Sequence, residues 1–240
     1  MHYLIVLSDP DPVASAVQEV LPTGEPTGWH VDGASVRRLG TNVFSLRRTI
    51  RHLEDDELEI RLPPELTKIG PSLVFPSIHR SERGVRCFTA HPIGNFGDSA
   101  DLGGRPNQLT PSTPRLMADA LRRLDEGGRR EGVSATLEAT HHGPFERLPS
   151  VFVEIGYGDD PKPAETSVRT MAHVLVELAE DPQDRIVVGS GGGHYAPHYT
   201  ELSLHRSWAF GHIVPRHAPD PGAGDPLRAA FDATPGALGV

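Results

Sequence analysis

The sequence predicts an α/β fold with three layers, α/β/α, and a mixed, mostly parallel sheet. Short apolar runs typical of buried strands recur along the chain, separated by segments that have the apolar spacing of helices. Several of these runs end directly in glycine or proline beside a polar side chain. We expect one domain over residues 1–240, because a chain of this length can bury a large single core.

The first predicted strand covers residues 3–7, an uninterrupted apolar run of the kind that is buried on both faces of a sheet. Asp11 can cap a helix and Pro12 suits its first turn, and apolar residues then recur at helical spacing up to residue 21. A strand followed by a helix is the beginning of an α/β unit.

Residues 22–64 carry a weaker pattern, with turn residues and brief apolar pieces at 29–31 and 57–62 that we expect to be short strands. We therefore expect a small insertion or subdomain here. The C-terminal segment 219–240 is rich in proline, glycine and alanine, and is expected to be loosely structured around a short helix at 225–233.

The remaining segments alternate between helix and strand patterns. Helices are expected from about residue 114 to the glycine pair at 127–128, and over about 164–179. Strands are expected over residues 72–75, 85–90, 133–139, 151–156, 186–188 and 208–214.

The charge pattern limits the classes of partner. A net charge of −9 disfavours a uniformly basic nucleic-acid coat. Of the 23 basic residues, only Lys68 and Lys162 are lysine. The arginines occur in groups, which are either solvent-exposed faces or a surface that binds phosphates. These groups are Arg37, Arg38, Arg47, Arg48 and Arg51; Arg80, Arg83 and Arg86; and Arg122, Arg123, Arg129 and Arg130.

Composition also limits the kind of site. The single cysteine, Cys87, excludes an intrachain disulfide and a cysteine-rich metal centre, so a metal would be held by His, Asp and Glu. There is no apolar run of about 20 residues, and the opening run is short and lacks a basic leader. We therefore expect a soluble, cytoplasmic protein with no membrane partner, and a monomer.

The stretch Glu138 to Pro144, with the sequence EATHHGP, is the first candidate site. It follows an apolar run, and Gly143-Pro144 ends that run. Histidine titrates near neutral pH and ligates zinc, so His141 and His142 beside Glu138 are suited to metal or proton chemistry. A hydrogen-bonded or surface histidine pair is the alternative.

Three further strand ends share this arrangement of an apolar run, a turn residue and a polar group. They are His91 with Gly94-Asn95, Glu154 with Gly156, and Gly191-Gly192-Gly193 with His194. Ligands of parallel α/β sheets bind beyond the carboxyl ends of the strands. We therefore expect His91, His142, Glu154 and His194 to meet in one cleft.

Alternatives remain open for several of these residues. The triple glycine is either a flexible loop or a cradle for an anion, and it lacks the Lys-Ser or Lys-Thr of a P-loop. Asn95 is either a turn residue or a substrate contact. His79 and His212 are either catalytic or structural, and His173 lies off the apolar stripe of its helix, as a surface histidine does.

Together these motifs resemble the D-aminoacyl-tRNA deacylases of the archaeal and plant type. The most specific part is the order THHGP, VEIG, GGGHYAP. Ile78, Ile93 and Tyr157 depart from the family pattern, where we expect Arg, Thr and Ser. The resemblance also rests on Ser8, Asp11-Pro12, Ser77-x-His79-x-Ser81, His91-Pro92-x-Gly94-Asn95 and Gly211-His212-Ile213.

The resemblance implies a fold similar to phosphorylases and peptidyl-tRNA hydrolases, a requirement for zinc, with one ion or two per chain, and hydrolysis of D-aminoacyl-tRNA. Residue chemistry then suggests roles. The zinc ligands would come from His91, His141, His142, Glu154 and His194. Glu138 would be the general base, and His79 or His212 would protonate the ribose oxygen. Gly192 and Gly193 would hold the oxyanion, and Ser77, Asn95 and Tyr195 would contact the substrate.

Two other functions fit the same residues. A zinc-dependent peptidase or amidohydrolase would use the same histidines and carboxylates, and a non-catalytic RNA-binding or metal-buffering protein would use the arginines and histidines. A covalent acyl-enzyme is disfavoured, because no serine lies in a GxSxG elbow and Cys87 lies in the middle of a predicted strand.

Overall fold

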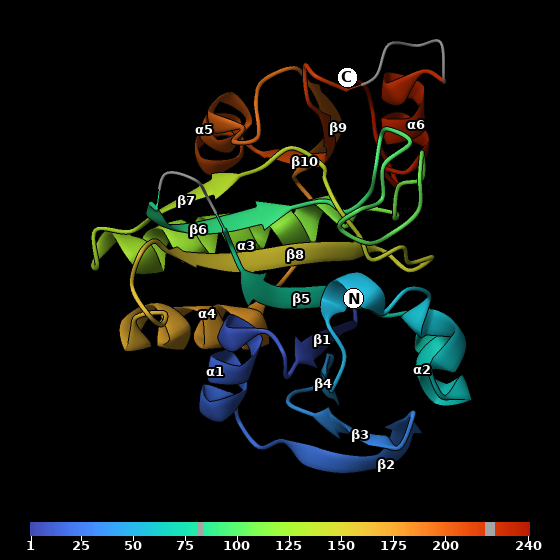
Figure 1. Ribbon diagram of the computed structural model, residues 1–240, viewed down its shortest axis with the longest axis vertical. Helices are drawn as coiled ribbons and strands as arrows, with labels where there is room; N and C mark the ends of the chain where they lie inside the picture. The colour runs from blue at the N-terminus through green and yellow to red at the C-terminus, as the bar shows by residue number, and fades with distance from the viewer. Residues whose placement is uncertain (81–83, 219–223) are drawn as a thin grey trace.

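The computed structural model describes residues 1–80, 84–218 and 224–240, so Ser81, Arg83 and the start of the C-terminal segment at 219–223 lie outside the described residues. Eight strands form the main sheet, in the order β2-β3-β4-β1-β5-β8-β6-β7 (Figure 1). Their bounds are β1 Tyr3–Ser8, β2 Glu25–Val31, β3 Ala34–Arg38, β4 Val43–Arg48, β5 Ser72–Ile78, β6 Arg86–His91, β7 Ser134–Leu137 and β8 Ser150–Tyr157.

The directions of these strands make the sheet mixed and mostly parallel. β4, β1, β5 and β8 pair in parallel, and so do β6 and β7. β6 runs antiparallel to β8, and β2 and β3 join the sheet as antiparallel strands. The predicted α/β class with a mostly parallel mixed sheet is confirmed.

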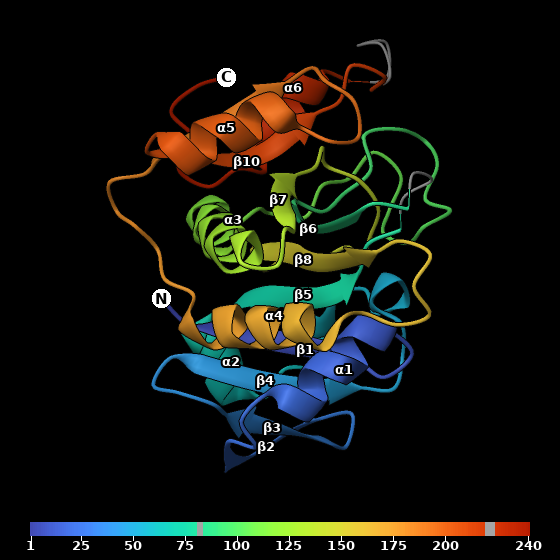
Figure 2. The ribbon, with the colours of Figure 1, turned by 90° about the vertical axis from the view of Figure 1, so that its left-hand side faces the viewer.

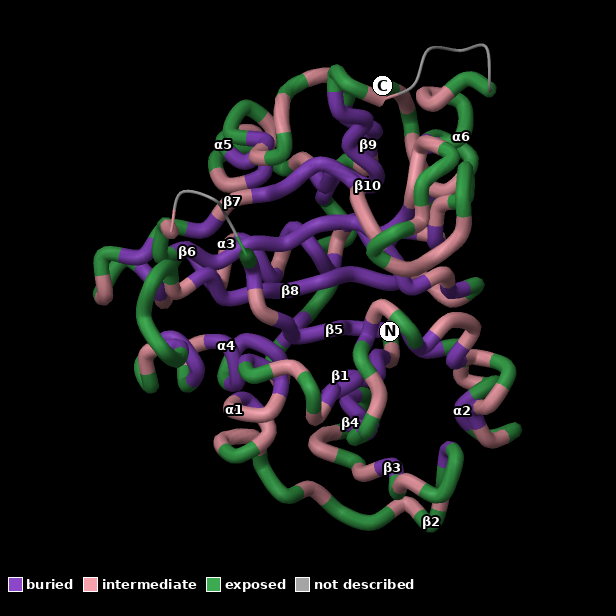
Figure 3. Tube along the Cα trace, in the orientation of Figure 1, coloured by how far each residue is buried: buried purple, intermediate pink, exposed green. Residues whose placement is uncertain are grey.

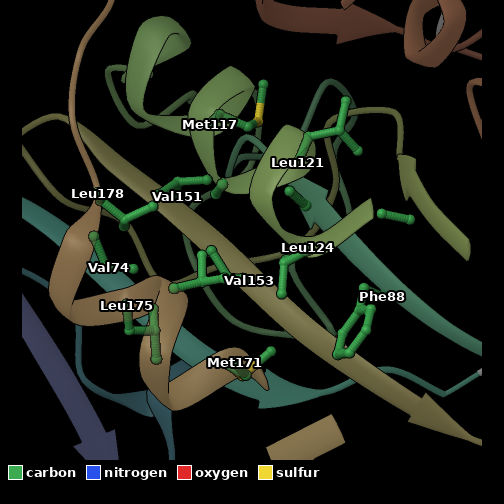
Figure 4. Packing of buried hydrophobic residues seen from close by; sticks show 14 of the residues in the cluster. Val74, Phe88, Met117, Leu121, Leu124, Val151, Val153, Met171, Leu175 and Leu178 are labelled. Carbon is green, nitrogen blue, oxygen red and sulfur yellow. The ribbon is translucent and has the colours of Figure 1, made fainter. Parts of the chain in front are cut away.

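One face of the sheet is covered by three helices, α1 (Pro12–Val20), α3 (Pro114–Arg129) and α4 (Glu165–Glu177) (Figure 2). The apolar stripes of α3 and α4 pack on alternate residues of β8, namely Val151 and Val153 (Figure 4). Alternate residues of a strand point to opposite faces, so Phe152 and Glu154 point away from these helices.

The other face carries a smaller layer. The 3₁₀ helix η2 (Leu58–Arg61) and helix α2 (Pro64–Ile69) pack there with Phe75 and Phe152 in a second apolar cluster. The sheet is therefore enclosed between two layers, as predicted. It is on this second face that the polar side chains of β6 and β8 gather.

A two-stranded parallel sheet adjoins the main one. It consists of β9 (Arg185–Ser190) and β10 (Trp208–Val214), with α5 (Pro197–His205) and α6 (Pro226–Asp232) beside it (Figure 2). The end of the chain bonds to β9, since Val188 N donates to Gly239 O at 3.0 Å. The described part of the C-terminal segment thus contains α6 and a backbone hydrogen bond to β9.

Residues 22–64 also differ from the expectation. They form β2, β3 and β4, which continue the main sheet from β1 instead of building a separate subdomain. β2 is an exposed edge strand, as Figure 3 shows, so it lacks the apolar signal of a buried strand. Residues 57–62, expected as a strand, contain the 3₁₀ helix η2.

Among the described helices, none combines the length and the apolar character that crossing a membrane requires.

Candidate metal and catalytic site

A cavity of about 560 Å³ opens on the polar face of the sheet. It lies between the start of α1, the short helix η1 (His52–Glu54), the end of β5 and the residues that follow β7. The residues of chemical interest in its wall are Asp11, Arg51, Ser77, His79, Arg80, His141, His142, Glu154 and His194. Sequence positions more than 180 residues apart thus meet in one place.

Three imidazoles in this region are held in the same way. The Nδ1 nitrogens of His91, His141 and His142 lie 3.1, 2.8 and 2.7 Å from the carbonyl oxygens of Pro92, Ala139 and Gly143. A carbonyl oxygen can only accept, so each Nδ1 carries the proton. Each neutral ring therefore keeps its lone pair on Nε2, which is how metal-binding histidines are usually oriented.

The three rings lie close enough to share one ion. One ring nitrogen from each of His91, His141 and His142 lies within 4.8 Å of the other two. The His91 ring is held in place by Phe152, which is nearly parallel to it with the centroids 5.2 Å apart. His91 is completely buried and its Nε2 has no hydrogen-bond partner among the described residues. A metal ion would supply that partner, so the donor set fits a metal.

Electrostatics keep two of these rings neutral. Burial, and then the neighbouring His91, lower the pKa of His142 to about 4 and the pKa of His141 well below its usual range. Burial also acts on His91, but the Glu154 carboxylate outweighs it and raises the pKa of His91. At neutral pH, His141 and His142 therefore offer lone pairs.

Glu154 lies in the middle of β8, 4 % exposed. Its Oε2 accepts hydrogen bonds from His79 Nδ1 and Thr89 Oγ1, both at 3.2 Å, and its Oε1 lies 3.6 Å from His91 Nε2. Burial opposes the charge on Glu154, but the hydrogen bond from His79 and the nearby His91 imidazole hold its pKa well below the usual range. The carboxylate is thus ionised at neutral pH.

Glu138 is completely buried behind the cavity wall. His79 Nδ1 and His194 Nε2 lie 3.2 and 3.3 Å from its Oε1, yet neither oxygen accepts a hydrogen bond with good geometry from a described residue. A buried carboxyl group without a donor is costly, so this too favours a cation nearby. His79, Glu138 and His194 form a second group whose donor atoms lie within 4.8 Å of one another.

His79 connects these groups to the loop after β9. Its Nε2 lies 2.8 Å from the hydroxyl of Tyr195. Burial lowers the pKa of His79, but Glu154 and Glu138 outweigh burial and raise it. His194, with nearly half of its side chain exposed, lies at the mouth of the cavity.

The strands deliver these residues by a route that differs in part from the predicted one. The sequence suggested parallel strands ending at a common edge, and this holds for His91 at the end of β6 and for the histidine pair after the parallel strand β7. β8 runs antiparallel to β6, so Glu154 enters from the middle of β8, where Thr89 pairs with Glu154 and His91 pairs with Phe152. Their side chains meet because paired residues lie on the same face. The direction of β6 carries no local signal, which is why the prediction was wrong on this point.

His194 arrives by backbone pairing between the two sheets. Ala139 N donates to His194 O at 2.8 Å, and Glu138 forms an isolated antiparallel bridge with Tyr195. The segment after β7 is therefore fixed to the glycine-rich loop, although β7 and β9 belong to different sheets.

Other predicted site residues lie elsewhere or have other partners. His212 does not line the cavity: it is completely buried, with ring nitrogens 3.0 Å from Thr140 Oγ1 and Thr110 O, and burial lowers its pKa to about 4. Its predicted catalytic role does not fit this position, because the ring lies outside the cavity wall, whereas the buried His79 is part of that wall. In the sequence, a histidine that follows a glycine in a strand can be either catalytic or structural, and this pattern does not distinguish the two.

Four further residues were expected from the sequence to contact substrate. Asn95 uses its amide to brace a loop, donating to Gly103 O at 2.9 Å and Arg105 O at 3.3 Å. Gly192 and Gly193, the predicted oxyanion donors, are not among the residues that line this cavity. The hydroxyl of Ser77, which does line the cavity, donates to Asp11 Oδ2 at 2.7 Å.

Sequence reasoning missed two contributors. Thr89 bonds Glu154, and the signal available for it was its position two residues before His91, on the same face of a strand. Asp11 was expected only to cap α1, which it does through Oδ1, while its Oδ2 also accepts from Ile78 N at 3.1 Å. Nothing local predicts that second contact.

Comparison with known proteins now identifies the family. The family model described as D-aminoacyl-tRNA deacylase matches residues 69–239, which include every member of the cluster. The chain belongs to the D-aminoacyl-tRNA deacylase family.

Curated relatives of the family carry that name. The Thermoplasma acidophilum D-aminoacyl-tRNA deacylase is 40% identical over 171 residues, covering 70% of this chain and 65% of that protein. The Methanococcoides burtonii relative is 31% identical over 229 residues, covering 90% of this chain and 46% of that protein. The chain thus spans less than two thirds of the length of these relatives.

A crystal structure described as a conserved protein of unknown function has the same fold. It superposes with a TM-score of 0.82 at 27% identity, covering 97% of this chain and 82% of that one.

Proposed function

We propose that this chain is a hydrolase that cleaves the ester between a D-amino acid and the terminal ribose of tRNA. The observation that carries the proposal is the convergence of His91, His141, His142 and Glu154 beside an open cavity, in a chain of the deacylase family. The curated relatives are named for this activity, which supports the same substrate here.

We also propose that zinc is the cofactor. His91, His141 and His142 would hold it through Nε2, with Glu154 as the carboxylate of the set. The donors suit zinc, which prefers imidazole and carboxylate in a set of about four. When bound, zinc would polarise the ester carbonyl and lower the pKa of water at the site.

The residues around these ligands would handle protons. Glu138 is sealed from the cavity, whereas His194 opens to it and directs Nε2 to Glu138 at 3.3 Å. His194 would therefore accept the proton of the attacking water on Nδ1, with Glu138 stabilising the resulting imidazolium. This modifies the expectation that Glu138 acts directly as the base.

His79 would complete the proton path. It lies between Glu154 and the Tyr195 hydroxyl, and the Glu154 and Glu138 carboxylates outweigh burial and raise its pKa, which favours the protonated imidazole. It could return a proton to the ribose oxygen as the ester breaks. Asp11, Ser77 and the Ile78 amide form a bonded corner of the cavity that keeps the His79 segment in place.

The test compares D-tyrosyl-tRNA with L-tyrosyl-tRNA, each with and without a zinc chelator. We expect faster release of D-tyrosine, loss of that release with the chelator, and recovery on adding zinc. Equal rates on both esters, or none, would contradict the deacylase. Preference for peptides would identify a peptidase instead, and tight tRNA binding without turnover an RNA-binding protein.

A further inference from the structure

A second cavity, of about 440 Å³, lies beside the first, and the two share His141, His142 and Leu102. It is lined by Gly94, Asn95, Phe96, Gly97, Ser99, Asp101, Thr140, Pro215, His217 and Ala218 in addition to those three. Both volumes fall in the range of about 300–1,000 Å³ that holds small ligands. The histidine pair is thus the boundary between two separate binding spaces.

The first cavity, which contains Arg51 and Arg80, is suited to phosphate. Both arginines are exposed, and neither guanidinium has an ion-pair or hydrogen-bond partner in the described part of the chain. Many other arginines are already paired; Arg48, for example, binds Asp55 and Asp32. Two unpaired guanidinium groups at the rim of one cavity would attract a polyanion.

The carboxylates of the first cavity would repel a phosphate little. Both oxygens of Asp11 accept hydrogen bonds, from the Val13 and Ala14 amides on one side and from Ser77 on the other. Glu154 is bonded to His79 and Thr89. Because Glu154 is buried, Asp11 is the one carboxylate near this rim among the described lining residues, and the two guanidinium groups outnumber it.

The second cavity has the opposite character. None of its described lining residues is arginine or lysine, and Phe96, Leu102, Pro215 and Ala218 give it an apolar wall. Its carboxylate is Asp101, whose Oδ2 accepts from Ser99 Oγ at 2.7 Å while Oδ1 has no partner within the described ranges. His217, also exposed, is the remaining titratable side chain besides the shared histidine pair.

We propose that the two cavities divide the substrate, with the phosphates of the tRNA end at Arg51 and Arg80 and the aminoacyl group in the second cavity. The free α-ammonium group of the amino acid would face Asp101, and its side chain would face Phe96 and Leu102. The ester then lies at His141 and His142, the boundary that both cavities share. This inference rests on the proposed deacylase function and assigns the halves of its substrate.

The first test concerns the ammonium group. Asp101→Asn keeps the acceptor for Ser99 but loses the charge. We expect it to lower the preference for D-tyrosyl-tRNA over N-acetyl-D-tyrosyl-tRNA by about tenfold, the size of a 1.4 kcal/mol interaction. The control Asp98→Asn lies in the same loop but outside both cavities and bonds Asn107. It should leave that preference unchanged.

The second test concerns the phosphates. Arg51→Gln and Arg80→Gln should each lower the preference for D-tyrosyl-tRNA over D-tyrosine methyl ester by about fivefold to tenfold. The salt dependence of log(kcat/KM) should also flatten, by about 0.7 in slope for each phosphate that the variant no longer neutralises. Arg130→Gln, an exposed arginine at the end of α3 that lines neither cavity, is the control.

The outcomes separate the two proposals. The division of the substrate alone is overturned if the wild-type chain is active but Asp101→Asn slows both tyrosyl esters equally. It is also overturned if the arginine variants slow hydrolysis of the methyl ester as much as that of the tRNA ester. A wild-type chain that releases no D-tyrosine from tRNA overturns the proposed function itself.

Discussion

Nε2 of His91 lies 3.6 Å from Oε1 of Glu154, between two strands that pair antiparallel in the middle of the sheet. Both side chains are buried, and His91 Nδ1 is already bonded to Pro92 O. When the His91 ring is neutral, its Nε2 lone pair and a Glu154 carboxylate oxygen therefore face the same point. Its neighbours His141 and His142 present their own Nε2 atoms nearby.

At the proposed zinc site, removing one imidazole should abolish metal binding. We expect His91→Ala and His142→Ala to lower the zinc bound per chain and the deacylation rate by at least about 100-fold, since even indirect partners of a metal contribute 10- to 100-fold. Elemental analysis of the purified variants, together with single-turnover hydrolysis, measures both. The control is His173→Ala, an exposed histidine of α4 that pairs with Glu177. Full zinc content in both cluster variants would exclude them as ligands.

His212 should prove structural. His212→Gln loses buried hydrogen bonds to Thr110 and Thr140, so we expect the free energy of unfolding to fall by about 1–3 kcal/mol. The rate of the chemical step should stay within a few-fold of wild type. Urea unfolding and single-turnover rates distinguish the two effects. A loss of rate without loss of stability would restore the catalytic role.

The same residue makes a pH prediction. Burial lowers the pKa of His212 to about 4, below the value of about 6.5 in an unfolded chain. The unfolded chain therefore binds more protons between these values, and stability should rise as pH rises from 4 to 6.5. His212→Gln should weaken that rise in urea unfolding curves, and an unchanged rise would contradict a buried neutral imidazole.

Glu146 should give the opposite pH dependence. It is completely buried, and burial, then the nearby Glu59 carboxyl, raise its pKa to about 10. The folded chain then holds a proton that the unfolded chain releases above about pH 4.5, so this group makes stability fall as pH rises from 4.5 to 10. Glu146→Gln keeps the shape and removes the ionisation.

Urea unfolding at several pH values tests the Glu146 prediction. The free energy of unfolding of Glu146→Gln should exceed that of wild type by at least about 1 kcal/mol at pH 9, with a smaller difference at pH 5. A difference of equal size at both values would show that the proton on Glu146 does not matter. Glu126→Gln, an exposed carboxyl on α3, serves as the control.

The loop at Gly103 should be intolerant of a side chain. Its φ is +80°, and an added Cβ would lie 2.1 Å from the carbonyl oxygen of Leu53, which lines the first cavity. Gly103→Ala should therefore destabilise the fold and raise KM for aminoacyl-tRNA. Gly132→Ala is the matched control, because its φ is +68° but an added Cβ would meet nothing within 4 Å.

The two alanine variants separate strain from collision. Gly132→Ala should cost about 1–2 kcal/mol of unfolding free energy for the left-handed backbone alone. Gly103→Ala should cost about 1–3 kcal/mol more, because the Leu53 backbone must move. Equal costs, with KM unchanged, would mean that the loop shifts without affecting the cavity.

The buried parts of the fold were predictable because their signal is local. β1, β8 and α3 lie close to their expected positions, since continuous apolar runs and a helical stripe are the direct consequence of burial. β2 is exposed along most of its length and contains Pro26 and Gly28, so it has no such signal. Strand direction is set by contacts far along the chain, as the reversal of β6 shows.

The residues of the candidate site also differ in how far local sequence predicts them. His91, His142, Glu154 and His194 were expected to meet in one cleft. His142, Glu154 and His194 line the first cavity, and His91 forms one group with His142 and another with Glu154. His212 has the same residue type and the same kind of strand position, but its partners Thr110 and Thr140 come from other segments. The partners of a histidine, rather than its neighbours in sequence, distinguish a packed ring from a reactive one.

The position of β6 and β8 inside the main sheet has a consequence for local unfolding. His91 and Glu154 lie on the interior strands β6 and β8, whereas β2 and β3 form an exposed edge that β4, β1 and β5 separate from β8. Edge strands open with less free energy than interior ones. In hydrogen exchange, we expect amides of β2 to exchange quickly while those of β6 and β8 stay protected. The β2 edge of the sheet can therefore unfold locally while the residues of the site on β6 and β8 stay in place.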